Sequence, residues 1–332
     1  MIKLERTANG FNLFYKDYLF IQHTLKRPCL KIGSGQGRFK SKYGSFKIKD
    51  KVRKKVSLLS FTIVSETENK IVIDFETESE KMNVVFESKN DYLEIKPTCT
   101  NPEINRLWLS LNAKADEAIY GGGEQFSELN LRGKNLPLWV EESGVCRGDP
   151  KWLTFLMNLL VGIGGHWYTT YYPQPTFVSS ENYFCHVDTT SYAKFNFKNE
   201  SHHILYIWDV PNRILIGKYN NALETLSKLT EFLGRQPELP EWVFDGVWLG
   251  IQGGNEVVEQ KVQRCLDKGV IVKAVWCQDW EGIRMRRFGK RLFWNWVYDK
   301  NLYPNLPAFI NNLNARGIKF LGFGTVFKID IL

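Results

Sequence analysis

The sequence lacks three features that mark specialised classes of protein. Its six cysteines form no C-x-x-C pair, and no Cys/His spacing suits zinc. The most apolar run, Trp152 to Gly165, is too short and too interrupted to span a bilayer, and the N-terminus has no apolar stretch of signal-peptide length. We therefore expect a cytoplasmic protein that keeps its thiols reduced, does not bind a membrane, and has no metal site and no cofactor.

The amino-acid composition is also not extreme in any class of residue. Hydrophobic residues make up 43%, charged residues 24% and aromatic residues 14%, which excludes a disordered, collagen-like or coiled-coil protein. The length of 332 residues is about twice that of a usual domain and favours two domains. Tryptophan is abundant at 11 copies, which indicates either thick cores or a site that stacks on flat ligands such as sugar rings.

Most of the positive charge lies in one segment. The formal net charge is +8, but residues 26–55 hold twelve Lys and Arg against Asp50 alone, so the rest of the chain is slightly acidic. Within residues 38–55 the cations alternate with Phe39, Tyr43 and other apolar residues, which favours the solvated face of a sheet. A patch that binds polyanions is the alternative; we expect no nucleic-acid partner.

From about residue 10 to 215 the chain is a series of short alternating runs with turn signals between them, and this spacing predicts an all-β sandwich. The predicted strands include residues 56–65, 71–77, 82–87, 92–97, 176–178, 183–187, 192–197 and 204–209. The period then changes: Asn220 or Asn221 can cap a helix that Gly234 ends. Residues 234–240 are expected to form a stiff linker.

Beyond the linker, strands and helices are predicted to alternate. The order is a strand at 243–251, a helix at 255–268, a strand at 270–278, a long loop, a helix opened by Pro304, and a strand at 318–323. This βαβαβ order begins either a Rossmann-like sheet or a (β/α)8 barrel. A barrel needs about 200–250 residues, and residues 242–332 supply 91, so a barrel here would be incomplete.

The predicted domains are accordingly a β-sandwich at 1–219, a helix and linker at 220–240, and the first part of a barrel at 241–332. Two glycine-rich stretches could cradle phosphate. Gly33 to Gly37 lacks a following helix and a Lys-Ser/Thr pair, so we interpret it as a turn between strands. Gly121 to Gly123 suits a site-shaping loop that presents Glu124 and Gln125, with a plain turn as the alternative.

The densest polar and aromatic region is residues 275–296. Gln278 and Asp279 stand where a predicted strand ends and its loop begins, and Gln252 stands after the preceding strand. Amide, carboxylate, guanidinium and indole groups at such strand ends can bind sugar hydroxyls and stack on a pyranose ring. In the alternative, Trp294 and Trp296 pack under helices and the arginines are solvated.

These residues carry a resemblance to a known family. The motif Q-D-W-x-G-x-R-M-x-x-F-G-K-R-x-x-W-N-W at 278–296 resembles the second-strand loop of glycoside hydrolase family 31, in particular of its sulfoquinovosidases. Further similar motifs occur in the family's order up to about residue 322: G-G-G-E-Q-F-S at 121–127, N-L-R-G-K at 130–134, Y-P-Q-P-T-F-V-S at 172–179, C-H-V-D at 185–188, G-R-Q-P-E-L-P at 234–240 and L-G-I-Q-G-G at 249–254.

The resemblance implies a retaining α-glycosidase that acts on sulfoquinovosides, with a galactose-mutarotase-like β-sandwich followed by a (β/α)8 barrel. Arg291 and Trp294 match the family's sulfonate-binding pair, and Gln252 and Gln278 match its hydroxyl-binding glutamines. Glu124 is placed by the same resemblance on a sandwich loop that approaches the barrel mouth. The chemistry agrees, because a sulfonate stays anionic and needs a permanent cation with directional donors, which a guanidinium and an indole N–H supply.

The sequence also departs from the family. After Gly322 the family continues with further barrel strands that carry its two catalytic aspartates, whereas this sequence ends at Leu332 and Asp279 matches neither aspartate. We therefore assign no catalytic residue and expect an inactive fragment. The alternatives are a fragment of a family 31 enzyme for neutral α-glucosides, which would have no use for Arg291, and a non-catalytic carbohydrate-binding protein.

Overall fold

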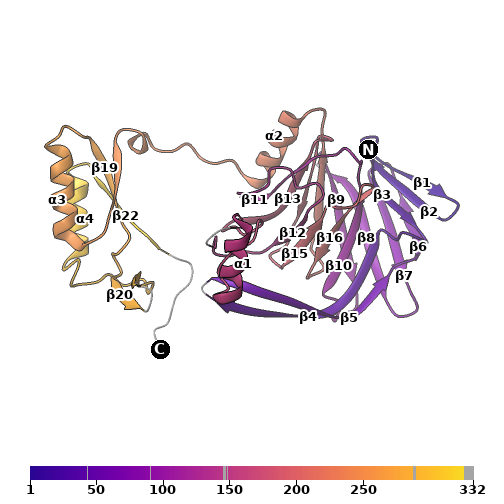
Figure 1. The fold of residues 1–332 in the computed structure, drawn as a ribbon. Helices are drawn as coiled ribbons and strands as arrows, with labels where there is room; N and C mark the ends of the chain where they lie inside the picture. Colours follow the sequence, from indigo (N-terminus) through magenta and orange to yellow (C-terminus); the bar gives the residue numbers. More distant parts are fainter. Residues whose placement is uncertain (43, 90, 145–146, 148, 287–288, 325–332) are drawn as a thin grey trace. The chain divides into compact units, whose positions relative to one another are not determined.

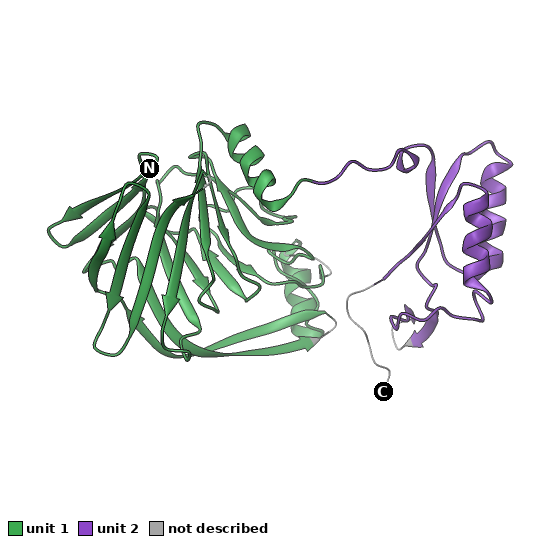
Figure 2. Ribbon diagram, turned by 180° about the vertical axis from the view of Figure 1, so that it is seen from behind, with its two compact units in different colours: residues 1–235 green, residues 236–332 purple. Residues whose placement is uncertain are grey.

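The computed structural model describes residues 1–42, 44–89, 91–144, 147, 149–286 and 289–324. Tyr43 of the cation-rich segment, Cys146, and residues 325–332, where the sequence departs from the family pattern, lie outside this described part. The chain divides into two compact units, Met1–Arg235 and Gln236–Leu332 (Figure 2). Each unit has its own hydrophobic core.

Unit 1 is built from antiparallel strands in three sheets (Figure 1). The smallest sheet contains β1 (Ile2–Thr7), β2 (Gly10–Tyr15) and β3 (Tyr18–Thr24). A six-stranded sheet contains, in spatial order, β12 (Asn135–Leu138), β15 (Ala193–Asn196), β16 (His202–Ile207), β10 (Arg106–Asn112), β4 (Leu30–Lys42) and β5 (Ser45–Ser57). An eight-stranded sheet contains β11 (Ile119–Gly123), β13 (Pro173–Ser179), β14 (Tyr183–Val187), β17 (Ile214–Lys218), β9 (Tyr92–Cys99), β8 (Lys81–Lys89), β7 (Lys70–Glu76) and β6 (Ser60–Glu66).

The two larger sheets share one core. Along β7 and β8 buried and exposed residues alternate, because successive side chains of a strand point to opposite faces. Phe177 of β13 meets Phe195 of β15 edge to face, with ring centroids 5.9 Å apart. The apolar faces of both sheets therefore contribute side chains to the same core.

Helix α2 (Ala222–Leu233) confirms the expected cap and stop. The Asn221 side chain accepts a hydrogen bond from the Glu224 N–H at 2.9 Å, and Gly234 follows the last turn with φ of +94°. Leu229 packs on Phe184 and Tyr219 of unit 1. The helix therefore covers part of the outer face of the eight-stranded sheet (Figure 1).

Helix α1 (Lys151–Leu160) was not expected from the sequence. It forms within the apolar run 152–165, and its Trp152 and Phe155 side chains are each 68% exposed. Two polar residues of the helix, Thr154 and Asn158, are four residues apart, but Thr154 is buried and Asn158 hydrogen-bonds Gly164 and Gly165 while apolar side chains face solvent. This inverts the usual pattern of a surface helix. No helix in the described part of the chain is long and apolar enough to cross a membrane.

The expected turn at Gly33 to Gly37 is wrong, because these residues lie within β4. A Cβ on Gly37 would lie 2.3 Å from the Trp208 ring, and one on Gly33 would lie 3.2 Å from the Trp108 ring and 2.1 Å from the Lys54 carbonyl oxygen. The glycines therefore let indole rings and a neighbouring strand approach the backbone of β4 closely.

The predicted strand at 56–65 is also wrong, because the run belongs to two strands in different sheets. β5 ends at Ser57 in the six-stranded sheet, and β6 begins at Ser60 in the eight-stranded sheet. Leu58 between them is completely buried. The chain stays apolar where it passes from one sheet to the other, because Leu58 is buried there. The alternation of apolar residues alone therefore does not reveal the break between the two strands.

Unit 2 has the predicted βαβαβ order. Its elements are the 3-10 turn Glu241–Val243, β18 (Val247–Ile251), α3 (Gly254–Leu266), β19 (Val272–Cys277), β20 (Ile283–Arg286), β21 (Gly289–Leu292), α4 (Leu306–Ala315) and β22 (Lys319–Gly322). β18, β19 and β22 form a parallel sheet in that order, whereas β20 and β21 form an antiparallel hairpin.

Three details of the prediction for unit 2 are corrected. The first strand begins at Val247 rather than 243, because the preceding residues form the 3-10 turn. The last helix begins at Leu306, with Asn305 as its cap and Pro307 in its first turn, so Pro304 does not open it. The long irregular loop contains the hairpin β20–β21.

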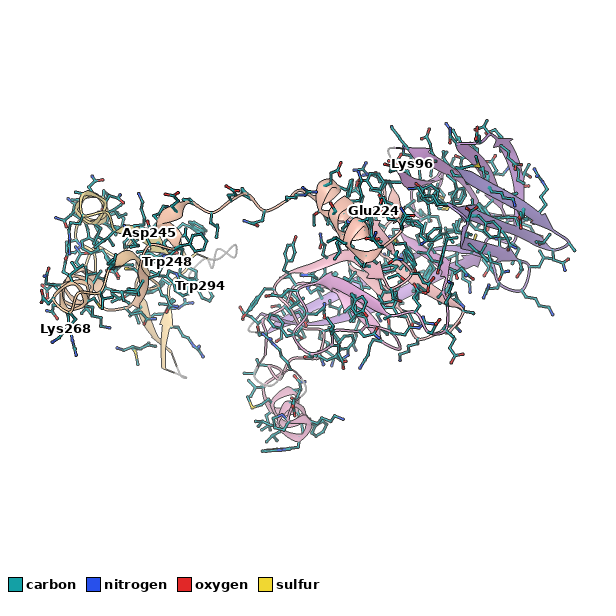
Figure 3. All side chains as sticks on the ribbon, turned by 90° about the horizontal axis from the view of Figure 1, so that it is seen from above. Lys96, Glu224, Asp245, Trp248, Lys268 and Trp294 are labelled. Atoms are coloured by element: carbon teal, nitrogen blue, oxygen red, sulfur yellow. The ribbon has the colours of Figure 1, made fainter. Side chains whose placement is uncertain are left out.

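The helices of unit 2 cover one face of its sheet. Ile251, Val275 and Cys277 pack with Val258 and Val262 of α3, and the Tyr303 ring lies in the same core. Trp248 lies on the other face, where its side chain stays 44% exposed. Figure 3 shows Trp248 and Trp294 on the side of the sheet away from Lys268, which follows α3.

Candidate functional site

The carboxyl ends of the three parallel strands of unit 2 meet at one edge of the sheet. Ile251 of β18 pairs with Cys277 of β19, and Cys277 pairs with Gly322 of β22. Loops that follow such strand ends carry the functional side chains of open parallel sheets and of (β/α)8 barrels. Gln252 and Gln278 are the first residues after β18 and β19, so the sheet places them beside each other.

The two predicted glutamines are in contact. Gln252 Nε2 donates a hydrogen bond to Gln278 Oε1 at 2.6 Å. Side chains alternate between the two faces of a strand, so Gln252 lies on the same face as Trp248 and Gln278 on the same face as Trp276. These tryptophans face away from α3 and α4, so the amide pair lies on the face that the helices leave uncovered. Their remaining donors and acceptors suit a polyhydroxylated ligand.

Asp279, the next residue, is completely buried. Its Oδ2 accepts a hydrogen bond from the Gly253 N–H at 2.6 Å, and its Oδ1 accepts one from the Tyr303 hydroxyl at 2.7 Å. Burial raises the pKa of Tyr303 well above its usual range, and the hydrogen bond to Asp279 adds to the increase. Tyr303 therefore stays protonated and serves Asp279 as a donor.

Glu281 is also buried, with 4% of its surface exposed. Its Oε2 accepts hydrogen bonds from the backbone N–H groups of Asn295 and Trp296, the latter at 2.6 Å. Trp296 has a φ of +59°, a conformation that side chains other than glycine rarely adopt. The carboxylate thus holds a strained turn directly after Trp294.

The predicted sulfonate pair lies on the same loop. Arg291, in β21, has an exposed side chain, and its guanidinium has no hydrogen bond or ion pair within the described part of the chain. Trp294 is half-buried, with its ring centroid 6.3 Å from that of Phe323, and its indole Nε1 has no partner among the described residues. The structure shows no direct contact between Arg291 and Trp294 in this part of the chain.

The remaining predicted residue, Glu124, belongs to unit 1. The glycines before it do not form a free loop, because Gly121 to Gly123 end strand β11 across a register shift and all three have positive φ. A Cβ on Gly123 would lie 2.0 Å from the Tyr172 carbonyl oxygen, which confirms the expected close approach of two backbones. Glu124 is exposed, and its Oε2 accepts a weak hydrogen bond from Thr170 at 3.4 Å.

A hollow of about 470 Å³ lies beside this strand end, lined by Gly121, Gly123, Gln125, Phe126, Ser127, Glu128 and Leu129. A second hollow of about 420 Å³ lies over β4 of unit 1. Aromatic rings of Phe39, Trp139, Tyr192 and Trp208 line it, and the Arg106 guanidinium stacks on the Trp208 ring at 4.4 Å.

The sequence indicates Gln252, Gln278, Arg291 and Trp294 as site residues, but it does not indicate the buried contacts of the nearby acids Asp279 and Glu281. The sequence pattern places Asp279 at a strand end without giving it a role, and no motif assigns a role to Glu281. A usable signal was present, since two carboxylates flank Trp280 directly after an apolar strand and buried carboxylates need donors. Among the described residues no cluster of three His, Cys, Asp or Glu could hold a metal ion.

Two curated proteins are similar to nearly the whole chain. The chain is 40% identical over 323 residues to a sulfoquinovosidase of Escherichia coli strain K12 and 34% identical over 319 residues to one of Agrobacterium fabrum. These matches cover 97% and 96% of this chain but 48% and 47% of the relatives, so the chain spans about half the length of the curated relatives it matches. No protein-family model matches the chain.

A solved structure agrees. The fold superposes on a sulfoquinovosidase of glycoside hydrolase family 31 from E. rectale with a TM-score of 0.87 and 40% sequence identity, over 97% of this chain and 48% of that one. A family 31 dextranase from Flavobacterium johnsoniae, with a TM-score of 0.51 and 15% identity over 79% of this chain and 30% of that one, shares the fold alone. The chain therefore has a mostly-sheet fold of the family 31 glycoside hydrolases. The resemblance of the chain to the sulfoquinovosidases of that family is confirmed.

Proposed function

We propose that this chain is the sugar-binding part of a retaining family 31 α-glycosidase that acts on α-sulfoquinovosides. Unit 1 is then the galactose-mutarotase-like β-sandwich of the enzyme, and unit 2 is the first part of its (β/α)8 barrel. The observation that carries the proposal is the contact between Gln252 and Gln278 at one sheet edge, with the unpaired Arg291 cation on the loop that follows. We further propose a cytoplasmic location, which the free thiols of Cys29, Cys99, Cys185, Cys265 and Cys277 support.

The side chains suit a sugar sulfonate. A sulfonate is anionic at every biological pH, so its recognition requires a cation that never loses its proton, and a guanidinium meets this requirement. Arg291 has no carboxylate partner to compete with the ligand in the described part of the chain. The glutamine pair offers amide donors and acceptors to the ring hydroxyls, and the indole of Trp294 offers a further N–H donor.

For residues 1–332 alone we propose binding without hydrolysis. Retaining hydrolysis needs a nucleophilic and an acid/base carboxylate about 5–5.5 Å apart. The resemblance assigns neither catalytic aspartate of the family to a residue of this sequence. Asp279 is completely buried and already accepts two hydrogen bonds, so it is not free to attack a sugar.

Titration calorimetry of the whole chain with sulfoquinovose tests this proposal. We expect measurable binding that Arg291→Ala weakens by about tenfold or more, because a charge-assisted contact contributes about 1.5–3 kcal/mol. The matched control is Arg264→Ala, which removes an exposed arginine of α3 and should leave binding unchanged. Turnover of an aryl sulfoquinovoside that Arg291→Ala abolishes would show that catalytic groups are present in this chain and contradict the proposal.

The same titration separates the alternatives. Equal affinity for methyl α-glucoside and sulfoquinovose would favour an enzyme of neutral α-glucosides. The aromatic hollow over β4 favours the non-catalytic alternative, because rings such as those of Trp139 and Trp208 can stack on sugars. If Trp139→Ala abolishes binding and Arg291→Ala does not, the chain binds carbohydrate through unit 1 instead.

A further inference from the structure

We infer that Asp279 and Glu281, the two buried carboxylates on either side of Trp280, are positioning residues of the sugar site: Asp279 sets the backbone beside the glutamine pair, and Glu281 sets the turn that follows Trp294. The identity of the ligand in this inference rests on the proposed function. The contacts that position the site do not, since every one of them joins residues of unit 2.

Asp279 acts on the backbone beside Gln252. Its Oδ2 accepts the Gly253 N–H, and Gly253 has a φ of +124°, so this peptide is held in a conformation that only glycine adopts readily. Its Oδ1 accepts the Tyr303 hydroxyl from the hydrophobic core. Because the carboxylate is anchored to the core, the Gly253 peptide and the neighbouring Gln252 are anchored with it.

Glu281 acts on the other half of the site. The backbone of the loop is closed by hydrogen bonds from Phe293 N to Gly282 O at 3.0 Å and from Asp299 N to Trp280 O at 2.8 Å. Between these two closures the Glu281 carboxylate accepts the N–H groups of Asn295 and Trp296. The turn that follows Trp294 is thus fixed from inside the loop.

Two observations argue against a role in stability alone. Trp296 occupies the left-handed region, where a residue other than glycine is strained, and such strain persists only where the surroundings enforce it. The second oxygen of Glu281, Oε1, is buried and has no hydrogen-bond partner among the described residues. A buried, half-satisfied carboxylate is unfavourable for stability, so its presence here indicates a requirement of the site.

The two acids should therefore have different effects on ligand selectivity. Glu281→Gln keeps the size of the side chain but replaces the charged acceptor with a neutral amide, so the turn after Trp294 loosens and Trp294 loses its fixed position. We expect sulfoquinovose binding to weaken by about tenfold and methyl α-glucoside binding to change little, because only the sulfonate uses that loop. Asp279→Asn should weaken both sugars by a similar factor, because both use the glutamine pair.

The experiment measures both sugars by calorimetry on the whole chain, with Glu256→Gln on the exposed side of α3 as the matched control. Circular dichroism establishes that each variant is folded. Should Glu281→Gln fail to fold, Glu281→Asp keeps the charge and withdraws the carboxylate from the two N–H groups, and the same selectivity change is expected. Parallel loss of both sugars in the Glu281 variants would overturn the inference for Glu281.

Hydrogen exchange provides a measurement that needs no ligand. In Glu281→Gln the amides of Asn295 and Trp296 should exchange faster, and in Asp279→Asn the amide of Gly253 should exchange faster, with the rest of unit 2 unchanged. If the unmodified chain binds neither sugar, the proposed function fails, but faster exchange at these amides still supports the positioning. Unchanged exchange at these amides would overturn the positioning even if the chain binds sulfoquinovose.

Discussion

Glu117 is a carboxylate in the core of unit 1, with 1% of its surface exposed. Its Oε1 accepts hydrogen bonds from the hydroxyls of Ser179 at 2.5 Å and Tyr183 at 2.6 Å, and His203 Nε2 lies 3.3 Å from its Oε2. Burial by itself raises the pKa of Glu117, but the imidazole of His203 and the two hydroxyl donors outweigh this effect and hold the pKa below its usual value. The core therefore contains a stabilised negative charge.

This residue should make the stability of unit 1 depend on pH. A carboxyl group whose pKa is lower in the folded state stabilises that state at pH values above its unfolded pKa of about 4.3, and this stabilisation is lost as the pH falls through the folded pKa. We expect Glu117→Gln to lower the free energy of unfolding at pH 7 by about 2 kcal/mol and to lower it less at pH 3. Denaturant unfolding followed by tryptophan fluorescence at both pH values measures this difference.

Asp116→Asn is the matched control for Glu117, because Asp116 is the neighbouring acid and its side chain is exposed. It should change the unfolding free energy little at either pH. An equal loss of stability at pH 3 and pH 7 in Glu117→Gln would show that the charge of Glu117 contributes nothing, and that the loss comes from packing and hydrogen-bond geometry.

At the scale of elements, strand β4 shows why the sequence holds three glycines within five residues. Arg106, beside this stretch, donates to Asp50 at 3.0 Å and stacks on Trp208, and the indole ring lies against the backbone at Gly37. The rings and the guanidinium form a second layer on the outer face of the six-stranded sheet. Glycine is needed at these positions because a Cβ would occupy the space of that layer.

We predict that Gly37→Ala destabilises the chain by about 1–3 kcal/mol, because overpacking forces side chains or backbone to shift. The new methyl group would meet the Trp208 ring at 2.3 Å. Thermal unfolding, with near-ultraviolet circular dichroism as a report on the indoles, measures the effect. Gly250→Ala is the control, because Gly250 also lies in a strand and no atom lies within 4 Å of a Cβ there. Similar losses in the two variants would contradict this explanation.

At the scale of the whole molecule, exposed apolar surface is the main feature. Phe244, Trp248 and Ile271 of unit 2 are 74%, 44% and 62% exposed, and α1 of unit 1 adds Trp152 and Phe155. Strands β18 and β22 are also the edges of the described three-stranded sheet. Apolar patches and open strand edges of this kind promote association.

We therefore expect residues 1–332 to self-associate as the concentration rises, and to bind a hydrophobic dye while folded. Sedimentation velocity over a series of concentrations measures the association, and Trp248→Lys should reduce it by placing a charge on the open sheet face. Leu223→Lys is the control, since it adds the same charge at an exposed position of α2 in unit 1. A monomer at all concentrations, with no dye binding, would contradict the prediction.

The sequence was most informative where local signals and the fold agree. The cap at Asn221, the stop at Gly234 and the βαβαβ order of unit 2 follow from local spacing, because caps and periodicity act within a few residues. The contact between Gln252 and Gln278 was foreseeable for the same reason, since parallel strands that end together bring their first loop residues together.

Other features were beyond such signals. The glycines at 33–37 lie in strand β4, where Gly37 leaves room for Trp208, a residue distant in sequence. The break between β5 and β6 occurs because the chain passes from one sheet to another. The place of Glu281 after an apolar strand indicates that this carboxylate is buried, but not which groups it binds. Its partners are the backbone N–H groups of residues 295 and 296, which almost any sequence would supply there.

The sequence by itself therefore determined the class of the molecule: strands followed by a βαβαβ segment, and polar residues at two strand ends with a family-specific motif. Only the tertiary structure decided which acids are buried beside them and which glycines face an indole. The physical reason is that periodicity, caps and motifs are local properties of the chain. Burial, register and hydrogen bonding between distant segments arise only when the sheets pack.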